Sequence, residues 1–404
     1  MNKSVAPLPQ YAKAPLLVLI SVFLMMQSLS TDMYVASLPS LATLFDVPAS
    51  TVQLTLSIFV MGFGSAQLAI GPMSDRFGRR PVLLWGLGLY LAASILCSLS
   101  PSIWLLIGAR FLQALGCSSA FIIGRAIIRD AYAPEHGTLI MVRASSWLSL
   151  TPLLGPIIGA YLEVWFGWRA VFAVHSIVSL ALILAVFFRL PETNANKDPR
   201  ATELAGILSS YREVLGTRTF WANALPGAFS YGSIFTFISG ASMVLIRVLH
   251  MPVTWFGYSF SFGTLGYMFG TMLCRRLLRT MSPGSAFRVG TGISLICGVL
   301  FLGCVMAGIH HWSIVLAVMF LTMAAHGINS PLSQAGSVSP FPAQAGTAAG
   351  LSGALFMVAA FIVGTIVGAT YNGTLYPIAV ISCMNGILLF VCVRVFPELK
   401  SKTA

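Results

Sequence analysis

Charged residues are scarce in this chain: only 8% of its 404 residues are Asp, Glu, Lys or Arg, whereas 57% are hydrophobic. The mean hydropathy is +0.87. Soluble domains carry about 25% charged residues, so this composition excludes an ordinary soluble fold. The scarcity of charge predicts a protein that crosses the membrane several times.

Acidic residues are the scarcer charge class, with 11 Asp and Glu against 23 Lys and Arg and a net charge of +12. Such an excess is also typical of nucleic-acid-binding proteins. Here, with both termini inside, 18 of the 23 basic residues fall on the cytoplasmic side, Arg110, Arg125 and Arg143 lie within helices, and Arg169 and Arg247 lie outside. The positive-inside rule explains this distribution. We therefore expect cytoplasmic termini and no nucleic-acid partner.

The chain also lacks the motifs of enzymes and ATP-driven pumps. It contains no His-Glu-x-x-His, no Gly-x-Ser-x-Gly and no Gly-x-x-x-x-Gly-Lys. Its seven cysteines lie in apolar runs without a Cys-x-x-Cys pair, so we expect buried free thiols. Neither enzymatic activity nor a cofactor or metal is expected. A receptor without transport activity is an alternative, although no sizeable output domain is present.

Apolar runs of about 20 residues, each long enough as a helix to cross about 30 Å of hydrocarbon, recur along the chain. The longest polar tract separates six runs from six. This predicts an N-terminal half at residues 1–190, a cytoplasmic linker at 191–218 and a C-terminal half at 219–404. The twelve predicted helices cover residues 16–36, 52–71, 82–100, 103–128, 138–162, 168–188, 220–246, 254–278, 287–308, 312–333, 345–369 and 374–396.

A single carboxylate, Asp32, lies deep within the first apolar run, and no other acid is as far from the end of a run. A charge at that depth costs about 2.5 to 3.5 kcal/mol on insertion scales. Because such residues mark substrate or ion pathways, we take Asp32 as the candidate proton-carrying group. A structural ion pair and direct contact with a cationic substrate are the alternative roles.

Arg110, in the fourth predicted helix, lies at a depth similar to that of Asp32. At 1.5 Å per residue, Asp32 is about 6 Å from the outer end of its helix and Arg110 about 10 Å from the outer start of its own. If the helices adjoin, the two charges are expected to pair directly, through Gln113 or through a water. A nearby arginine favours the charged carboxylate and desolvation disfavours it, so a change in their distance changes the proton affinity of Asp32.

A loop rich in glycine and arginine follows the second predicted helix. Gly71 and Gly78 are expected to allow tight turns, and Asp75 to cap a helix start or pair with an arginine. The weaker counterpart at residues 270–279 lacks the aspartate, so a latch is expected in one half only. Positive-inside anchoring, or snorkelling for the basic residues near Asp130, is the alternative. The predicted cytoplasmic gate comprises Gly71, Asp75, Arg76, Gly78, Arg79, Arg80 and Asp130.

Residues 71–80 resemble the signature loop of the major facilitator superfamily, and three further features narrow the resemblance. Arg110-Phe-Leu-Gln113-Ala-Leu-Gly116 resembles the Arg-x-x-Gln-Gly-type motif of its proton-coupled members. Thr151-Pro-Leu-Leu-Gly155-Pro156-Ile-Ile-Gly159 is similar to the Gly-Pro motif of drug and proton antiporters, with Thr151 in place of the leading glycine. Residues 30–39 and 340–349 together resemble the bicyclomycin-resistance (Bcr/CflA) branch.

This resemblance implies an all-α polytopic membrane protein, with twelve transmembrane helices in two six-helix halves and cytoplasmic termini. It implies a monomeric secondary transporter of the bacterial inner membrane that exports drugs or related small amphipathic molecules in exchange for protons, by alternating access. The implied partners are a small-molecule substrate, protons and the lipid bilayer. A proton-coupled or passive carrier of an endogenous metabolite, such as a nucleoside-like or amino-acid-like compound, is the alternative.

The same resemblance implies that the first and fourth helices adjoin, and that the substrate cavity lies between helices 1, 4, 7 and 10. Tyr231 and Phe235 share a helix face at i and i+4, although ordinary packing explains either ring alone. His326 is a candidate second titrating group or a hydrogen-bond partner of a neighbouring helix. The helix 5 residues Gly155, Pro156 and Gly159 are expected to allow close helix approach. The candidate cavity residues are Gln27, Thr31, Gln113, Tyr231, Phe235, His326 and Asn329.

Overall fold

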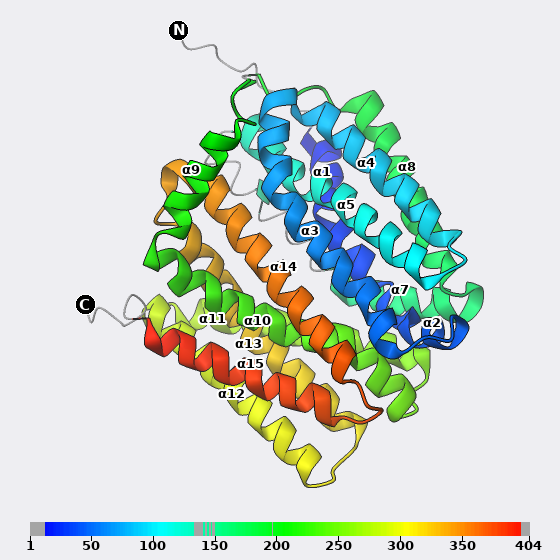
Figure 1. Cartoon of the computed structure of the whole chain (residues 1–404). Coiled ribbons are helices and arrows are strands. Elements are labelled where there is room, and N and C mark those ends of the chain that lie inside the picture. The colour runs from blue at the N-terminus through cyan, green and yellow to red at the C-terminus, as the bar shows by residue number, and fades with distance from the viewer. Residues whose placement is uncertain are drawn as a thin grey trace.

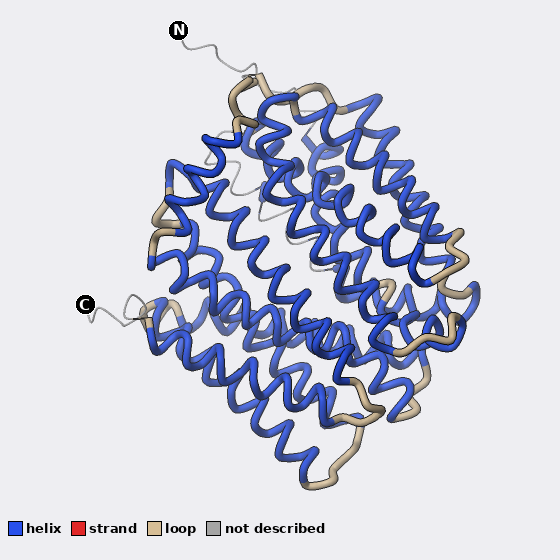
Figure 2. Tube along the Cα trace, viewed as in Figure 1, coloured by secondary structure: helices blue, strands red, loops and turns tan. Residues whose placement is uncertain are grey.

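The computed structural model of the chain describes residues 13–132, 150–195 and 197–396, together with residues 140, 141, 144 and 147. Over these residues the chain is helical apart from short connections, and they contain no strand (Figure 2). A helix satisfies its backbone hydrogen bonds within one segment, which is why apolar runs adopt this structure in a membrane. The predicted all-α fold is confirmed.

The N-terminal half crosses the membrane six times, and its first span is interrupted. The fifth predicted helix is only partly described, and Arg143 lies outside the described residues. The elements of this half are α1 (Lys13–Asp32), the 3₁₀ turn η2 (Val35–Ser37), α2 (Leu38–Leu44), α3 (Ala49–Phe77), α4 (Arg79–Ser98), α5 (Ile103–Ala131), α7 (Leu150–Phe166) and α8 (Arg169–Arg189).

The C-terminal half also crosses the membrane six times and follows a short linker helix, α9 (Leu204–Leu215). Its first span ends in a π-helical turn. The elements of this half are α10 (Arg218–Ser242), the π turn η3 (Met243–Val248), α11 (Val253–Leu277), α12 (Pro283–Met306), α13 (Trp312–Val338), the 3₁₀ turn η4 (Pro342–Gln344), α14 (Ala345–Thr370) and α15 (Tyr376–Val395).

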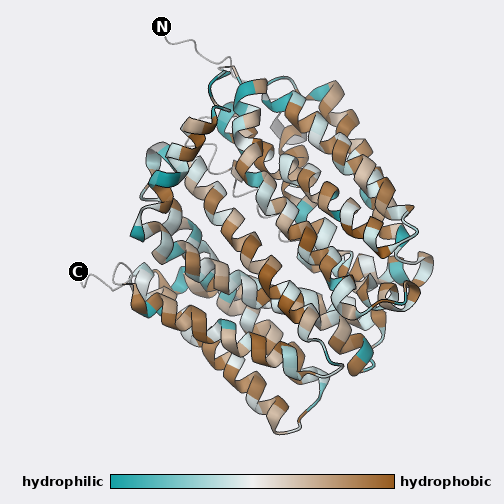
Figure 3. Ribbon diagram, in the orientation of Figure 1, coloured by the Kyte–Doolittle hydropathy of each residue, from teal (hydrophilic) through white to brown (hydrophobic). Residues whose placement is uncertain are grey.

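Each of the twelve predicted runs corresponds to a helix in the described part of the chain. Ten spans are long and apolar enough to cross a membrane by themselves. The other two are α7, which is apolar over 17 residues, and α11, which has 25 residues. Hydrophobic residues dominate the bodies of the helices in Figure 3, and hydrophilic ones gather near helix ends and loops. The predicted twelve-helix architecture is confirmed.

The turn after the second span is shorter than predicted. α3 continues to Phe77, so Gly71 lies inside a helix, and the prediction of a turn there is wrong. An isolated glycine weakens a helix by only about 1 kcal/mol, which the surrounding span outweighs. The turn falls on Gly78, whose φ of 105° is rarely adopted by residues with a Cβ. A Cβ there would also meet the carboxylate of Glu192.

The first membrane span is broken at Asp32. α1 ends at this residue, Met33 and Tyr34 form a turn, and η2 then leads into α2. The sequence predicted one helix over residues 16–36, so the predicted end is wrong and the break was missed. A break inside a span frees backbone groups that other protein groups must satisfy. Asp32 therefore lies at a helix end in the interior of the protein.

The two halves lie side by side and meet along two pairs of helices (Figure 1). α14 packs along α3, where a Cβ on Gly353 would meet the side chain of Gln67. On the other side α11 packs against α7, where a Cβ on Gly257 would lie 2.8 Å from the carbonyl oxygen of Pro156. Small residues allow such close approach of helices in a membrane.

Side-chain bonds also join the halves near each end. At the outer end, Nη2 of Arg247 donates to the carbonyl oxygen of Pro39, at 2.5 Å, and to the hydroxyl of Thr43. Arg247 belongs to η3 and its two acceptors to α2, so this contact links the two halves. The side chain of Arg247 is thus a candidate outer gate.

At the cytoplasmic end, α9 contacts both halves. The Tyr211 hydroxyl donates to the carbonyl oxygen of Leu68 in α3, at 2.8 Å. Nε2 of Gln344, just before α14, donates to the carboxylate of Glu213, at 2.6 Å. The polar tract at residues 191–218 therefore contains an ordered helix that bridges the two halves.

Candidate functional site

The carboxyl group of Asp32 is buried, with 5% of the residue exposed. It accepts hydrogen bonds from the hydroxyl of Ser28, one turn earlier in α1, and from Oγ1 of Thr31 at 3.0 Å. The ion pairs formed among the described residues involve other carboxylates. Asp32 is thus a buried acid whose partners are two neutral hydroxyls.

Arg110 in α5 is completely buried. Its Nη1 donates to the carbonyl oxygen of Ser30 at 3.1 Å and to Oε1 of Gln113 at 2.6 Å, and its Nε donates to the carbonyl oxygen of Thr55 at 3.4 Å. The guanidinium carbon lies 4.2 Å from the centre of the Phe59 ring. Carbonyl dipoles and a ring face thus surround this cation.

The expected ion pair between Asp32 and Arg110 is absent from this conformation. The break in the first span explains the difference. Because α1 ends at Asp32, its last carbonyl groups lack helical partners and carry the negative end of the helix dipole. Arg110 binds one of these carbonyls, that of Ser30, and is therefore compensated by the backbone two residues before the acid.

A closed ring of hydrogen bonds holds Arg110 in position. Nε2 of Gln113 donates to Oγ of Ser94 at 2.8 Å, and Ser94 donates to the carbonyl oxygen of Tyr90 at 2.7 Å. The Tyr90 hydroxyl bonds to Oγ of Ser30 at 2.6 Å. Gln113 is fully buried within this ring. It orients Arg110, and its place in the substrate cavity stays a prediction.

Two glycines of α7, Gly155 and Gly159, pack directly on the break in the first span. A Cβ at Gly155 would lie 3.2 Å from the Cβ of Asp32. A Cβ at Gly159 would overlap the carbonyl oxygen of Met33 and lie 2.7 Å from its Cα. Pro156, between them, turns its carbonyl toward α11 of the other half. This segment therefore touches both the acid and the interface between the halves.

On the C-terminal half, aromatic and polar groups of three helices meet around His326. The Tyr231 ring lies 6.0 Å from the His326 ring, and the Tyr267 ring lies 5.8 Å from it. Nδ1 of His326 is 2.9 Å from Oγ of Ser230. Tyr231 also stacks on Phe235, with centroids 6.4 Å apart and an angle of 29°. The cluster joins α10, α11 and α13.

This cluster faces the acid of the other half through Gln27. The Gln27 side chain, which lies in the same helix as Asp32, interacts with the Tyr231 hydroxyl. Both Gln27 and Tyr231 are partly exposed. The structure thus brings together Asp32, Gln27, Tyr231 and His326, although their helices α1, α10 and α13 belong to different halves.

Three other predicted cavity residues are buried. Thr31 has 4% of its surface exposed and donates to Asp32, so it supports the acid. Phe235 is 1% exposed and lies behind Tyr231. Asn329 has no exposed surface, and its Nδ2 donates to Oγ of Ser294 in α12 at 3.4 Å. In this conformation Phe235 and Asn329 pack between helices.

A second group of charges lies at the cytoplasmic end of the N-terminal half. Nη1 of Arg79 is 2.5 Å from Oδ1 of Asp75, and its Nε is 2.8 Å from Oδ2 of Asp130. Nη1 also donates to Oγ of Ser74 at 2.7 Å. Only 5% of the Arg79 side chain is exposed. This Arg79 cluster ties α3, α4 and α5 together within one half.

The remaining arginines of the predicted gate have other partners. Nη1 of Arg76 donates to the hydroxyl of Thr202 in the linker. Nη2 of Arg80 donates to the carbonyl oxygen of Phe187 at the end of α8, at 2.7 Å. Neither arginine pairs with Asp75, whose arginine partner is Arg79.

With this geometry in place, the likeness to known proteins identifies the family. The sequence pattern of the Major Facilitator Superfamily matches residues 18–396. The chain belongs to the Major Facilitator Superfamily. It is therefore a multi-pass membrane transporter.

Curated relatives of this superfamily member carry names of antibiotic resistance. The bicyclomycin resistance protein homolog of Haemophilus influenzae is 26% identical over 358 residues, covering 89% of this chain and 90% of its own length. The chloramphenicol resistance protein of Pseudomonas aeruginosa is 34% identical over 297 residues, covering 72% and 69%. Multidrug resistance protein D of Escherichia coli is 24% identical and covers 93% and 94%. The predicted Bcr/CflA resemblance is confirmed.

Solved structures of other transporters share the fold. An inward-facing bacterial homolog of the human lysosomal transporter Spinster has a TM-score of 0.73 at 14% identity, covering 98% of this chain and all of its own. A D-xylose-proton symporter has a TM-score of 0.70 at 15% identity, covering 96% and 99%. At this identity the likeness concerns the fold alone.

One residue of this transporter that contacts the Arg79 cluster, Glu192, was not predicted from the sequence. The carboxylate of Glu192, in the linker, accepts hydrogen bonds from the backbone N–H of Arg79 at 2.9 Å and of Arg80 at 3.2 Å. It caps α4, the role expected of Asp75, which instead lies in the last turn of α3. Glu192 is the first acid after α8, but it is more than 100 residues from its partners, and no local pattern joins them.

Proposed function

We propose that this transporter exports drugs or related small amphipathic molecules from the bacterial cell across the inner membrane in exchange for protons. The observation that carries the proposal is the setting of Asp32. It is a buried acid at a break in a membrane helix, bonded to two hydroxyls and lying, with Gln27 of the same helix, opposite Tyr231 of the other half. An acid without a fixed cationic partner can exchange a proton. The resistance names of the relatives support the substrate class.

Exchange follows from competition for this one acid. When the protein is open to the outside, Asp32 takes up a proton and substrate leaves. When it is open to the cytoplasm, Asp32 gives up the proton and substrate binds. Arg110 donates to the carbonyl oxygen of Ser30, two residues before Asp32. A movement of α1 against α5 changes the distance between the Arg110 guanidinium and the Asp32 carboxyl group. The affinity of Asp32 for a proton changes with that distance.

The substrate is proposed to bind between Asp32 and the His326 cluster. The rings of Tyr231 and Tyr267 offer flat apolar surface, whereas Gln27, Ser230 and His326 offer hydrogen bonds. Few polar groups within an apolar site are typical of pockets for small organic molecules. Arg247, which bonds to the other half, would have to release Pro39 and Thr43 when the outer end opens.

The test measures drug transport in everted membrane vesicles under an imposed pH gradient, with chloramphenicol and bicyclomycin as probes. Wild-type protein is expected to accumulate at least one probe and to release protons when that probe is added to purified protein. Asp32→Asn keeps the shape of the side chain and removes the titrating group. We expect it to lose gradient-driven accumulation entirely.

The matched control is Asp46→Asn, the same chemical change at an exposed acid. Asp46 has a φ of 50°, a backbone conformation that asparagine also tolerates. This variant is expected to transport like the wild type. Gradient-driven transport and normal proton release by Asp32→Asn would refute the role of Asp32. Transport that ignores the pH gradient in the wild type would instead favour a passive carrier.

A further inference from the structure

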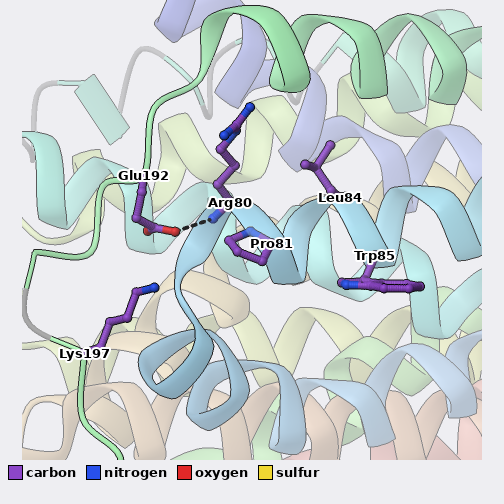
Figure 4. Close-up of a pocket in the computed structure, with 6 residues that line it drawn as sticks. All are labelled: Arg80, Pro81, Leu84, Trp85, Glu192 and Lys197. Atoms are coloured by element: carbon purple, nitrogen blue, oxygen red, sulfur yellow. Dashed lines mark hydrogen bonds between the residues drawn. The ribbon is translucent and has the colours of Figure 1, made fainter.

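A pocket of about 490 Å³ lies where the chain leaves α8 and passes the start of α4 (Figure 4). It is remote from Asp32 and independent of the proposed transport site. The first two turns of α4 form one wall and the linker forms the other, with Lys197 extending toward the start of α4. The lining residues are Arg80, Pro81, Leu84, Trp85, Glu192 and Lys197.

The α4 wall of this pocket faces the lipid. Pro81, Trp85 and Leu89 recur at four-residue spacing on an exposed face, and Trp85 is 82% exposed. At 1.5 Å per residue, Trp85 lies about 9 Å into the membrane from Arg79. That is the depth at which tryptophan is enriched in membrane proteins, beside the lipid headgroups. The pocket therefore opens at the cytoplasmic surface of the bilayer.

The polar side of the pocket carries two positive charges, those of Lys197 and Arg80. Lys197 is exposed and forms none of the ion pairs found among the described residues. The Arg80 guanidinium donates through Nη2 to the carbonyl oxygen of Phe187, but it forms none of these ion pairs either.

Glu192, the one acid among the lining residues, already accepts hydrogen bonds from the backbone. The carboxylate of Glu192 accepts backbone hydrogen bonds from Arg79, Arg80 and Asn194, at 2.9, 3.2 and 2.9 Å. These donors offset its charge, so Lys197 and Arg80 dominate the field in the pocket.

We propose that this pocket binds the phosphate headgroup of an anionic membrane phospholipid. Lys197 and Arg80 contact the phosphate oxygens, and the glycerol and first methylene groups lie along Pro81, Leu84 and Trp85. Basic pockets beside exposed aromatic residues at this depth suit such headgroups. The bound lipid holds the start of the linker against α4, next to the Arg79 cluster.

The experiment uses the full-length protein in phosphatidylcholine vesicles that contain a minor fraction of brominated lipid. Bromine quenches nearby tryptophan fluorescence, and the contribution of Trp85 is the difference between wild type and Trp85→Phe. We expect brominated phosphatidylglycerol to quench Trp85 at lower concentration than brominated phosphatidylcholine. Equal quenching by the two lipids would overturn the proposal.

Two variants locate the effect. Lys197→Gln is expected to raise the phosphatidylglycerol concentration needed for half-maximal quenching about fivefold, the factor that one basic residue contributes near an anionic surface. Arg200→Gln removes the same charge from the linker, but Arg200 has an 85% exposed side chain outside the pocket. This control is expected to behave like wild type, and an equal effect of both variants would indicate general attraction to the membrane.

A third arm distinguishes lipid from a soluble anion. Glycerol phosphate in excess over the lipid is expected to leave the quenching by brominated phosphatidylglycerol unchanged, because it lacks the acyl chains that contact Leu84 and Trp85. Full displacement of the lipid by glycerol phosphate would assign the pocket to a soluble phosphate and overturn the lipid proposal.

Discussion

The two halves of this transporter share an architecture but differ in the chemistry of their buried groups. The N-terminal half holds Asp32 and Arg110 inside the membrane and the Arg79 cluster at its cytoplasmic end. Residues 219–396 contain no Asp or Glu at all. Their buried polar groups are hydroxyls, amides and the His326 imidazole. Charge-dependent chemistry is therefore concentrated in one half, against which the other presents rings and hydrogen-bonding groups.

The difference also concerns how helices meet. In both halves glycines let backbones touch, but only in the N-terminal half does the touching backbone belong to a broken helix beside an acid. Gly159 faces Met33, the residue after Asp32, whereas Gly270 faces Ala324 within a continuous helix. Similar packing thus lies beside the proposed proton site in one half and joins two helices in the other.

The largest effect is expected from Gly159→Ala, compared with Gly270→Ala. A Cβ at Gly159 would lie 2.7 Å from the Cα of Met33, and one at Gly270 would lie 2.8 Å from the Cα of Ala324. Each change is expected to destabilise the protein by about 1 to 3 kcal/mol, because neighbouring backbone must move. Both losses are measured by thermal unfolding in detergent.

Only Gly159→Ala is expected to abolish gradient-driven transport by the folded protein, since it displaces the break at Asp32. Gly88→Ala serves as the control, because a Cβ there would meet no atom within 4 Å. Equal transport by the Gly159 and Gly270 variants would erase the proposed difference between the halves.

The next effect is expected from Arg79→Gln, compared with Arg276→Gln in the corresponding loop of the other half. Loss of Arg79 leaves Asp75 and Asp130 without their shared cation. We expect a loss of roughly 2 kcal/mol in stability, below the range for fully buried pairs because both acids are partly exposed. Arg276 is exposed, and its variant is expected to change the melting temperature little. Matching losses would contradict an asymmetric charge network.

The smallest effect is expected from His326→Gln. The variant loses the 2.9 Å bond to Ser230 and one ring beside Tyr231. Substrate affinity is expected to fall about threefold to tenfold, in line with the loss of one hydrogen bond. Proton release per bound substrate should stay at the wild-type value, because the proposed carrier is Asp32. Loss of that proton release would move the titrating group into the C-terminal half.

The membrane spans were predictable because hydrophobicity is a local property of each run. The ends of the spans were harder to predict. α3 continues through Gly71 and ends before Gly78, a glycine with positive φ that lies beside the Glu192 carboxylate. The break after Asp32 had no sequence signal either. It depends on the closely packed backbone beside Gly159 and on the donors that satisfy the freed carbonyls.

The sequence named the residues of the candidate site but not the contacts that they make. The rise per residue predicted that Asp32 and Arg110 lie at similar depths in the membrane. It gives no information on how each helix is rotated about its axis. Rotation places the guanidinium on the Ser30 carbonyl and buries Gln113 behind it. The same limit explains why Asn329 was assigned to the cavity although it packs on α12.

The amino-acid sequence by itself determined the number of membrane spans, their sidedness and the isolation of Asp32, since these follow from runs of apolar residues and the scarcity of acids. The tertiary structure alone decided that Arg110 donates to a carbonyl at the end of α1 and to another in α3, that Gly155 and Gly159 pack on the break after α1, and that Glu192 caps α4. Each of these contacts joins residues from separate helices or from the linker. Their physical cause is the packing of spans against one another, which no single span encodes.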